Sequence, residues 1–381
     1  MKNLAILGST GSIGKNTLEV IEHFPQEFRV WGLSAHSNIE LLETQIQKHK
    51  PKLVTITDEK SYRALKGKIS KAKLLFGIDG LNEMVSLPEI DLVINGLVGS
   101  VGLFPSLTAM ENGKTLALAN KEVLVMAGEL ITQKAKDKNA QILPIDSEHS
   151  GIFQCLFSGK KEEVKNLFLT ASGGPFLNRD KKEFDKIKVQ EALAHPTWKM
   201  GKKITVDSAT LMNKTLEIIE AHWLFNMAAE KIKVVIHPQS IVHSLVEFID
   251  GSIIAQMGPT DMKLPIQYAL FYPERKMATS NGFNLSSVKN LTFQEPDTEK
   301  FPAVKLGYQA LKLKGTAPAV LNAANEVAVN CFLEEKISFK QISSTVEEVL
   351  SSHSVISAPG LDDILKADQW GREKTLTLLK N

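Results

Sequence analysis

The chain has 381 residues, of which 43% are hydrophobic and 23% charged, an ordinary balance for a globular enzyme. Its formal net charge of +2 provides no large basic field, which argues against a nucleic-acid-binding protein. We find no signal or transit peptide and no apolar run of the roughly 18 residues that a membrane-spanning helix requires. Cys155 and Cys331 stand in apolar surroundings, which favours buried free thiols, a reducing compartment and a cytoplasmic location.

The first 145 residues alternate between short apolar runs and segments of helical periodicity. Such alternation predicts a parallel sheet wrapped by crossover helices, that is, a Rossmann-like α/β domain. Residues 38–49 are a clear example of an expected helix. The expected strands are residues 4–7, 29–33, 53–56, 73–76, 91–97, 115–120 and 140–145. Because such sheets bind ligands beyond the carboxyl ends of their strands, a site is expected there.

Glycines follow the first expected strand at regular intervals. Gly8, Gly11 and Gly14 form the pattern G-x-x-G-x-x-G, which lets backbone N–H groups approach a pyrophosphate at the start of a helix. A tight strand-to-helix turn without a ligand would also need glycine, but the position at the first strand favours dinucleotide binding. A P-loop is excluded, because Ser9 and Asn16 replace residues which that motif requires.

The segment 33–38 bears on the choice between NAD(H) and NADP(H). NAD-specific sites place an acid about 20 residues after the glycine turn, and this segment contains none. Ser37 and Asn38 offer neutral hydrogen bonds and His36 a partial positive charge, which suits a 2′-phosphate. We therefore predict NADP(H), with a solvated turn and a helix N-cap at Asn38 as the alternative.

Two acidic residues follow the last expected strand of this domain. Asp146 and Glu148 are separated by one residue, and an extended segment would point both carboxylates to the same side. Such acids repel each other unless a cation, a proton or water lies between them, and hard divalent ions prefer carboxylate oxygens. Two solvated loop acids would show the same pattern, so the metal interpretation depends on the rest of the chain.

Residues 204–224 supply that context, and we expect an extended start followed by a helix. Asn213, Lys214 and Glu217 stand at i, i+1 and i+4, so they share one sector of the helix. Glu217 can be a third carboxylate ligand, while Asn213, Lys214 and the upstream Ser208 are donors suited to a phosphate. A surface helix with a solvated Lys–Glu pair is the alternative.

Two further segments carry candidate ligands. Ser172 precedes two glycines at the end of an expected strand, where backbone N–H groups could form an anion-binding nest. Residues 194–201 contain His195, Trp198 and Met200 in a segment with a proline and a glycine, which is unlike a core strand and typical of a mobile lid.

Strands and helices complete the chain. Residues 241–248 and 252–258 flank Asp250-Gly251, a strong hairpin signal, and these strands could pair with another subunit or lie within the monomer.

Residues 273–298 have the composition of a linker. Four helices are expected after residue 299, at 301–314, 317–336, 338–353 and 361–380, which predicts a small helical bundle. Pro318 suits a first helical turn, and Asn322 and Glu326 are expected to face solvent or a domain interface.

Several blocks together resemble the 1-deoxy-D-xylulose 5-phosphate reductoisomerase family, NADPH- and metal-dependent enzymes of the non-mevalonate isoprenoid pathway. The blocks are GSTGSIG (8–14), ALANKE (117–122), PIDSEHS (144–150), SGGPF (172–176), HPTWKMG (195–201) and VDSATLMNKTLE (206–217). They fall in the family's order, and the resemblance covers essentially the whole chain. PIDSEHS and VDSATLMNKTLE are specific, whereas the glycine loop is not.

The resemblance implies conversion of 1-deoxy-D-xylulose 5-phosphate to 2-C-methyl-D-erythritol 4-phosphate, with roles for matching positions. Mn²⁺, Mg²⁺ or Co²⁺ would be held by Asp146, Glu148 and Glu217 and would act as a Lewis acid. Catalytic residues would be these three acids with Lys121 and His195. Substrate would contact Lys121, Ser147, Glu148, Ser172, His195, Trp198, Met200, Ser208, Asn213, Lys214 and Glu217. NADPH would contact Gly8, Thr10, Gly11, Ser12, Ile13, Gly14, His36, Ser37, Asn38, Asn120, Glu122 and Gly201.

The family pattern also implies an arrangement of domains. We expect a Rossmann-like NADPH-binding domain at 1–145, a central α+β catalytic domain at 146–272 that carries the sheet of a homodimer, a linker at 273–298 and a helical bundle at 299–381. Many relatives carry Lys or Arg where this chain has His36, and a retro-aldol cleavage and a ketol shift both remain open.

Two other functions stay open. Another NADP-dependent dehydrogenase would explain the glycine loop but not three acids, and EDTA sensitivity separates it from a metal enzyme. A non-catalytic NADP-sensing regulator would bind nucleotide without turnover, but it leaves the pattern of residues 208–217 unexplained.

Overall fold

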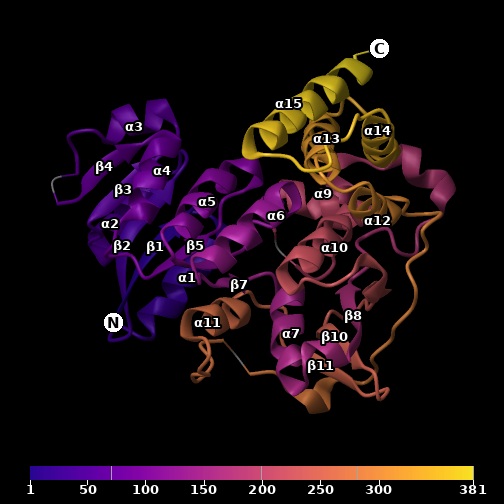
Figure 1. The fold of residues 1–381 in the computed structure, drawn as a ribbon, viewed down its shortest axis with the longest axis horizontal. Coiled ribbons are helices and arrows are strands. Elements are labelled where there is room, and N and C mark those ends of the chain that lie inside the picture. The colour runs from indigo at the N-terminus through magenta and orange to yellow at the C-terminus, as the bar shows by residue number, and fades with distance from the viewer. Residues whose placement is uncertain (70, 199, 281, 381) are drawn as a thin grey trace. The chain divides into compact units, whose positions relative to one another are not determined.

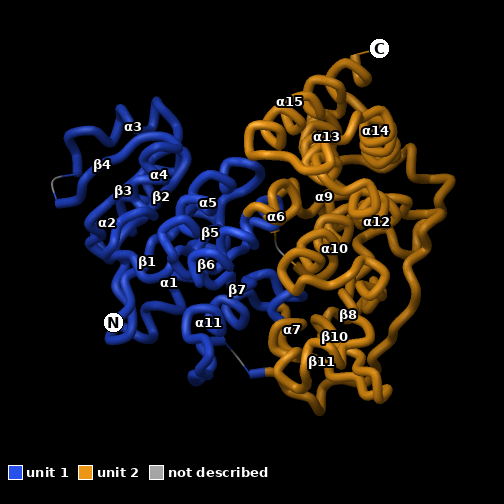
Figure 2. Tube along the Cα trace, in the orientation of Figure 1, with its two compact units in different colours: residues 1–123, 131–150, 261–282 blue, residues 124–130, 151–260, 283–381 orange. Residues whose placement is uncertain are grey.

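The computed structural model describes residues 1–69, 71–198, 200–280 and 282–380. The chain forms two compact units (Figure 2). Unit 1 comprises residues 1–123, 131–150 and 261–282, and unit 2 comprises residues 124–130, 151–260 and 283–381. The chain passes from one unit to the other twice within α6 (Glu122–Asp137), once within α7 (Ser147–Cys155), and again at residues 260–261 and 282–283. The four-part division expected from the sequence stays a prediction.

Unit 1 contains a parallel seven-stranded sheet in the order β4-β3-β2-β1-β5-β6-β7. Its strands are β1 (Lys2–Leu7), β2 (Phe28–Ala35), β3 (Leu53–Ile56), β4 (Lys73–Phe76), β5 (Leu92–Asn95), β6 (Thr115–Leu118) and β7 (Ile142–Pro144). All seven expected strands are therefore confirmed, and so is the Rossmann-like fold (Figure 1). Inner strands such as β3 and β5 are buried along their whole length because helices cover both faces of the sheet.

Helices alternate with these strands, as the periodicity predicts. They are α1 (Ser12–Glu22), α2 (Ile39–His49), α3 (Glu59–Leu65), α4 (Gly77–Ser86), α5 (Leu103–Glu111) and α6. A seventh helix, α11 (Lys263–Phe271), joins this unit from much later in the chain and packs against α1. The sheet order runs outward from β1 in one direction for β2–β4 and in the other for β5–β7, so the topological switch point lies between β1 and β5.

Unit 2 is built on a four-stranded sheet in the order β11-β10-β8-β9. Its strands are β8 (Val164–Ala171), β9 (Ile232–Ile236), β10 (Val242–Phe248) and β11 (Ile253–Met257). The β10–β11 pair is antiparallel, which confirms the hairpin expected around Asp250-Gly251. The helices α8 (Val189–Ala192), α9 (Lys202–Thr210) and α10 (Met212–Phe225) connect β8 to β9.

Four helices complete unit 2, and their number and places confirm the expected bundle (Figure 1). They are α12 (Ala303–Leu313), α13 (Ala317–Leu333), α14 (Phe339–Ser351) and α15 (Leu361–Leu378). Pro318 lies in the first turn of α13, as predicted. Asn322 does not face solvent, the first of the two expected alternatives: its side chain is fully buried and donates to Glu326, 3.0 Å away, while the domain-interface alternative stays a prediction. The reason is that α13 packs against both α14 and α15 and so has little free surface.

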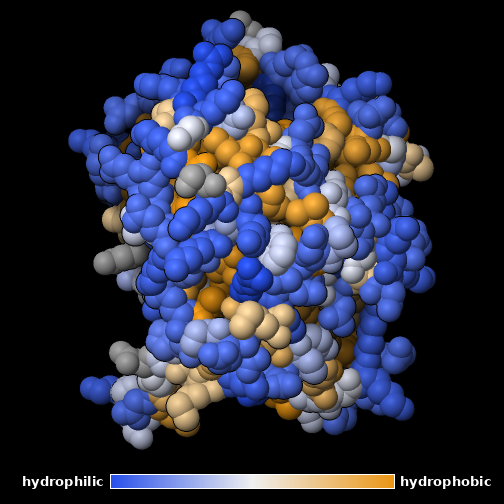
Figure 3. Space-filling view, turned by 90° about the vertical axis from the view of Figure 1, so that its left-hand side faces the viewer, coloured by the Kyte–Doolittle hydropathy of each residue, from blue (hydrophilic) through white to orange (hydrophobic). Residues whose placement is uncertain are grey.

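In the described part of the chain, no helix is long and apolar enough to cross a membrane. Figure 3 shows one face of the molecule, largely hydrophilic with hydrophobic residues gathered in limited patches. Cys155 and Cys331 are buried free thiols, as predicted. Burial raises the pKa of Cys155 to about 11, so this thiol is protonated and unreactive at neutral pH.

Candidate active site

The glycine turn lies at the switch point of the unit 1 sheet. Gly8 follows β1 with a φ of 79°, and a Cβ on it would approach the Gly96 carbonyl oxygen, after β5, to 2.9 Å. A Cβ on Gly14 would lie 2.4 Å from Cα of Ser9, so only glycine lets α1 begin so close to the turn. Among the described side chains none caps the first turn of α1, so its N–H groups could donate to an anion.

Several of the residues expected to contact NADPH lie in this turn or follow the neighbouring strand β2. Thr10 and Ile13 are half-buried, Gly11 and Ser12 are exposed, and all four belong to the turn or the first turn of α1. After β2, the side chains of His36, Ser37 and Asn38 are exposed. Asn38 caps α2 by accepting from the Leu41 N–H at 3.2 Å, so the N-cap interpretation of this residue is confirmed. His36 Nδ1 lies 2.9 Å from Thr57 Oγ1.

Asn120, Lys121 and Glu122 lie where β6 leads into α6. The Asn120 amide donates to the Gly99 carbonyl at 2.9 Å and accepts from the Val123 N–H at 3.3 Å, so it holds the loop after β5 in place. Lys121 is buried, and its ammonium forms an ion pair with Asp146. Glu122 is buried in the first turn of α6.

The acidic pair is placed differently from the expectation. Asp146 follows β7, but α7 begins at Ser147, so the segment is not extended and the argument that i and i+2 face the same side is wrong here. The strand is shorter than its apolar run because β7 is the edge strand and pairs only with β6. Ser147 Oγ donates to Glu148 Oε2 at 2.5 Å, so this hydroxyl orients the second carboxylate.

Asp146 is ionised in this environment. Burial by itself would raise its pKa, but the Lys121 ammonium, together with His149 and Glu148, holds the pKa well below its ordinary value. His149 Nδ1 lies 3.9 Å from Asp146 Oδ1. The sequence offered no reason to expect a role for His149. Residues at i and i+3 contact each other only on a helix, and no helix was expected to begin at Ser147.

In unit 2, two consecutive helices present the candidate ligands. Residues 204–210 are helical in α9, so the expected extended start is wrong; the break between α9 and α10 is a single residue, Leu211, with a φ of 60°. Asn213 and Lys214 both donate to the Glu217 carboxylate, which confirms that the three share one sector of α10. Lys214 and Glu217 are buried, so this sector is not a solvated surface.

His195 joins the two candidate serines. Its Nε2 lies 3.2 Å from Ser172 Oγ and 3.0 Å from Ser208 Oγ. Its Nδ1 accepts from the backbone N–H groups of Thr197 and Trp198 at 3.2 and 3.0 Å. An accepting Nδ1 places the proton of a neutral ring on Nε2, which therefore points a donor at the same space as the serine hydroxyls. Burial lowers the pKa of His195, and the Lys214 charge lowers it further, which favours this neutral form.

The turn after β8 lies beside the same cluster of unit 2. Gly173 and Gly174 have φ values of 85° and 67°, and the Gly174 N–H donates to Ser172 Oγ at 3.2 Å. Because a Cβ on Gly174 would approach the Ser208 carbonyl to 2.9 Å, this turn packs closely on α9. The predicted nest and Ser208 therefore belong to one cluster.

The expected lid has no regular secondary structure in the part that the structure describes; Lys199 lies outside the described residues. Trp198 is half-buried, with its ring centroid 6.3 Å from that of His243, and Met200 is half-buried. Gly201 is exposed at the start of α9, with open space around the position of a Cβ. The mobility of this segment stays a prediction.

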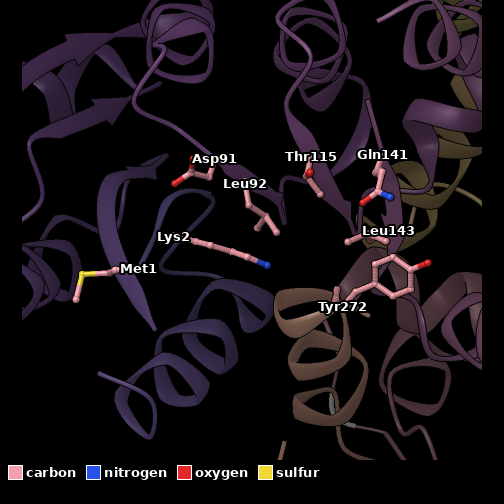
Figure 4. Close-up of a pocket in the computed structure, with 9 residues that line it drawn as sticks. Met1, Lys2, Asp91, Leu92, Thr115, Gln141, Leu143 and Tyr272 are labelled. Atoms are coloured by element: carbon pink, nitrogen blue, oxygen red, sulfur yellow. The ribbon is translucent and has the colours of Figure 1, made fainter. Parts of the chain in front are cut away.

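A pocket of about 320 Å³ opens at the amino ends of β1, β5, β6 and β7, the edge of the sheet opposite the glycine turn (Figure 4). The Lys2 side chain extends into it and donates to the Leu270 carbonyl at 3.2 Å, where α11 ends. Tyr272 lines the other side. The Lys2 ammonium therefore caps the C-terminal end of α11, and no residue of the glycine turn lines this pocket.

Comparison with known protein families gives consistent matches along the chain. The family model for 1-deoxy-D-xylulose 5-phosphate reductoisomerase matches residues 4–128. Models for C-terminal domains of the same family match residues 142–225 and 257–374. Among curated relatives, the 1-deoxy-D-xylulose 5-phosphate reductoisomerase of Caldanaerobacter subterraneus is 51% identical over 378 residues, 99% of each chain. That of Chlorobaculum tepidum is 49% identical over 381 residues, 100% of each chain.

Solved structures agree. A DOX-P reductoisomerase in complex with NADPH, fosmidomycin and magnesium matches with a TM-score of 0.94 and 40% identity, covering 100% of this chain and 98% of its own. The 1-deoxy-D-xylulose 5-phosphate reductoisomerase from Zymomonas mobilis in complex with NADPH matches with a TM-score of 0.92 and 38% identity, covering 100% and 99%.

Proposed function

Because this chain belongs to the 1-deoxy-D-xylulose 5-phosphate reductoisomerase family, we infer that it catalyses the reaction for which the family is named. It rearranges 1-deoxy-D-xylulose 5-phosphate and reduces the product with NADPH to 2-C-methyl-D-erythritol 4-phosphate, with the help of a divalent metal ion. It is thus an NADP-dependent oxidoreductase and isomerase of isoprenoid precursor synthesis.

The observation that carries this inference in the structure is the His195 cluster of unit 2. Three neutral donors gather there, because the hydroxyls of Ser172 and Ser208 lie 3.2 and 3.0 Å from His195 Nε2. The Lys214 ammonium is close enough to lower the pKa of His195. Neutral donors together with one cation suit the phosphate of a sugar phosphate, which accepts several hydrogen bonds and carries negative charge. We assign Ser172, Ser208, Asn213 and Lys214, with His195, to that phosphate.

Asp146, Glu148 and Glu217 are the residues that would hold the metal. The donor set fits a hard divalent cation such as Mg²⁺ or Mn²⁺, because it consists of carboxylate oxygens. Asp146 and Glu217 each form an ion pair with a lysine of their own unit, Lys121 and Lys214. A bound divalent ion would supply a Lewis acid for the negative charge that develops on substrate oxygens.

The residues around the metal ligands orient the rest of the substrate. Ser147 is bonded to Glu148, so its hydroxyl lies beside a metal ligand and can contact the substrate backbone. Lys121 pairs with Asp146 beside the metal ligands, and its ammonium would donate to a substrate oxygen. Trp198 and Met200 would close over substrate and exclude water.

NADPH would bind at the glycine turn. The uncapped first turn of α1 and the close approach of Gly8 and Gly14 fit a pyrophosphate. His36 and Ser37 are exposed beyond β2 and would contact the 2′-phosphate with Asn38. NADPH would supply the hydride that reduces the rearranged aldehyde.

We also propose that the protein is a cytoplasmic homodimer. The edge strand β11 exposes Ile253 and Ile254, by 53% and 37%, and a second copy would cover such an apolar edge. The two free cysteines suit a reducing compartment.

A single assay tests the proposed activity. The protein is incubated with NADPH, Mn²⁺ and 1-deoxy-D-xylulose 5-phosphate while the absorbance of the reduced nicotinamide is followed. We expect loss of absorbance that stops with EDTA and returns with excess Mn²⁺. Oxidation of NADPH that EDTA does not affect would instead support a metal-independent dehydrogenase.

A further inference from the structure

A buried hydrogen bond ties the phosphate-binding helix α9 to the C-terminal bundle. Asp207, on α9, is 1% exposed, and its Oδ1 accepts from Asn325 Nδ2 on α13 at 2.8 Å. Its Oδ2 pairs with Lys203 at 2.8 Å, one turn earlier on the same helix. Lys203 belongs to α9 itself, whereas Asn325 belongs to α13. The hydrogen bond from Asn325 therefore holds α9 in position against α13.

The hydrogen bond to Asp207 explains why a polar asparagine occupies the buried position 325. The side chain is fully buried in a helix composed mostly of Ala, Val and Leu, where a polar group is unfavourable unless it is bonded. Within the described residues no donor reaches its Oδ1, so the amide gains its partner only through Nδ2. A carboxylate accepts and cannot donate, so Asp207 also fixes which way the amide points.

The same stretch of α9 carries a phosphate ligand. Ser208 follows Asp207 directly, and successive residues of a helix point about 100° apart. Asp207 therefore points to the bundle while Ser208 lies 3.0 Å from His195 Nε2. Any rotation or slide of α9 that broke the bond to Asn325 would move Ser208 relative to His195.

We propose that Asn325 is a positioning residue for substrate phosphate binding, acting through Asp207 on Ser208. This gives the bundle a role in the site, although none of the residues assigned to the substrate lies in it. The proposal rests on the proposed function for the identity of the phosphate compound, and its test includes a measurement that needs no turnover.

The test compares Asn325→Leu and Asn325→Asp with the matched control Asn322→Leu. Asn322 is also a fully buried asparagine of α13, but it bonds Glu326 on its own helix and not α9. We expect both changes at 325 to raise KM for 1-deoxy-D-xylulose 5-phosphate by about tenfold, the usual effect of losing a bond to a charged group. KM for NADPH and kcat should change little, and Asn322→Leu should lower thermal stability without raising the substrate KM.

A rescue separates positioning from general destabilisation. Asn325→Asp places two carboxylates together, and adding Asp207→Asn restores one donor and one acceptor with the roles exchanged. We expect the double variant to recover much of the substrate KM. A double variant no better than Asn325→Asp, or a control that raises KM equally, would overturn the proposal. If one of the single changes at 325 prevents folding, the other carries the comparison.

The second measurement is the rise in unfolding temperature on adding inorganic phosphate. We expect wild-type protein and Asn322→Leu to show the same rise, and both variants at 325 to show a smaller one. If the wild type responds to phosphate but does not turn over the sugar phosphate, the proposed function fails while this inference is still tested. An equal response in all four proteins overturns the inference alone.

Discussion

Gln45, on α2, holds Ser9 of the glycine turn by two hydrogen bonds. Ser9 Oγ donates to Gln45 Oε1 at 2.7 Å, and Gln45 Nε2 donates to the Ser9 carbonyl at 2.9 Å. Both residues are buried, so the Gln45 amide makes these hydrogen bonds to the turn away from solvent. The side chain thereby fixes the backbone between Gly8 and Thr10, which would face the pyrophosphate of NADPH.

Gln45→Leu is expected to loosen this turn. Two buried bonds of roughly 1 kcal/mol each would be lost, so the free energy of unfolding should fall by about 2 kcal/mol. The Kd for NADPH should rise by about tenfold, because the turn must then be ordered on binding. Isothermal titration with NADPH measures this. Gln47→Leu, an exposed position on the same helix, is the control and should bind NADPH normally. Equal affinities in both variants would show that Gln45 has no part in binding.

Gln45 also illustrates what the sequence could not supply. The hydrophobic period and the glycine spacing predicted every strand of the unit 1 sheet, because those patterns are local. Gln45 lies 36 residues from Ser9 in the chain, and nothing in its neighbourhood distinguishes it from Gln47. Similarly, no local signal indicated that α11, at Lys263–Phe271, would join unit 1.

At the acidic residues the local sequence pattern predicted the wrong backbone conformation. A continuous apolar run through residue 145 predicted extended backbone at Asp146, whereas α7 begins at Ser147. The same happened at α9, where the β-branched residues Ile204, Thr205 and Val206 favoured a strand but are helical. Tertiary packing overrides such propensities, because Thr205 and Val206 are buried there. The i, i+4 spacing on α10 needed no tertiary information, and it was correct.

Glu217→Gln tests the metal assignment. The change keeps shape but removes the charge of a proposed ligand, so kcat/KM should fall by about 100-fold, or about 2.7 kcal/mol of transition-state stabilisation. The Mn²⁺ concentration for half-maximal activity should rise, while the Kd for NADPH stays near the wild-type value. Titrations with Mn²⁺ and with NADPH measure the two effects. Glu220→Gln, a buried carboxylate on the same helix, should leave the metal dependence unchanged. Activity of Glu217→Gln with the wild-type Mn²⁺ dependence would refute the three-carboxylate site.

Gly14→Ala tests how closely α1 must approach the glycine turn. The added Cβ would meet backbone atoms of Ser9 and Gly8 at 2.4 to 2.6 Å, and backbone cannot move aside cheaply. We expect a loss of stability of about 1–3 kcal/mol, as for an overpacked core, and at least tenfold weaker NADPH binding. At Gly11 the contact would be 3.2 Å, so Gly11→Ala should have a smaller effect of the same kind.

The control for this series is Gly282→Ala. Its Cβ would enter open space, and both stability and NADPH affinity should stay at the wild-type values. Thermal unfolding and NADPH titration rank the three variants. A Gly14→Ala protein as stable as Gly282→Ala would mean that the turn and α1 can separate without cost, contrary to the close packing described here.

The protonation of His195 gives a prediction with a definite sign. Its folded pKa lies below the ordinary 6.5, first because the ring is buried and second because of the Lys214 charge. The stability it contributes is therefore complete above pH 6.5 and is lost as the pH falls from there through the folded pKa, because the unfolded chain binds the proton more readily. Protonation would also end the acceptance by Nδ1 from Thr197 and Trp198, so the lid should loosen in the same range.

Lys214→Gln separates the two causes. Removing the lysine charge should raise the pKa of His195 toward 6.5, yet leave it below that value, because burial is the larger cause. Proton NMR titration of the ring measures the shift, with the resonance assigned by its absence in His195→Asn. Lys202→Gln, an exposed lysine at the start of α9, is the matched loss of charge and should leave the titration unchanged. A pKa that falls in Lys214→Gln would mean that the lysine acts by a contact other than its charge, and the phosphate site would need a different cation.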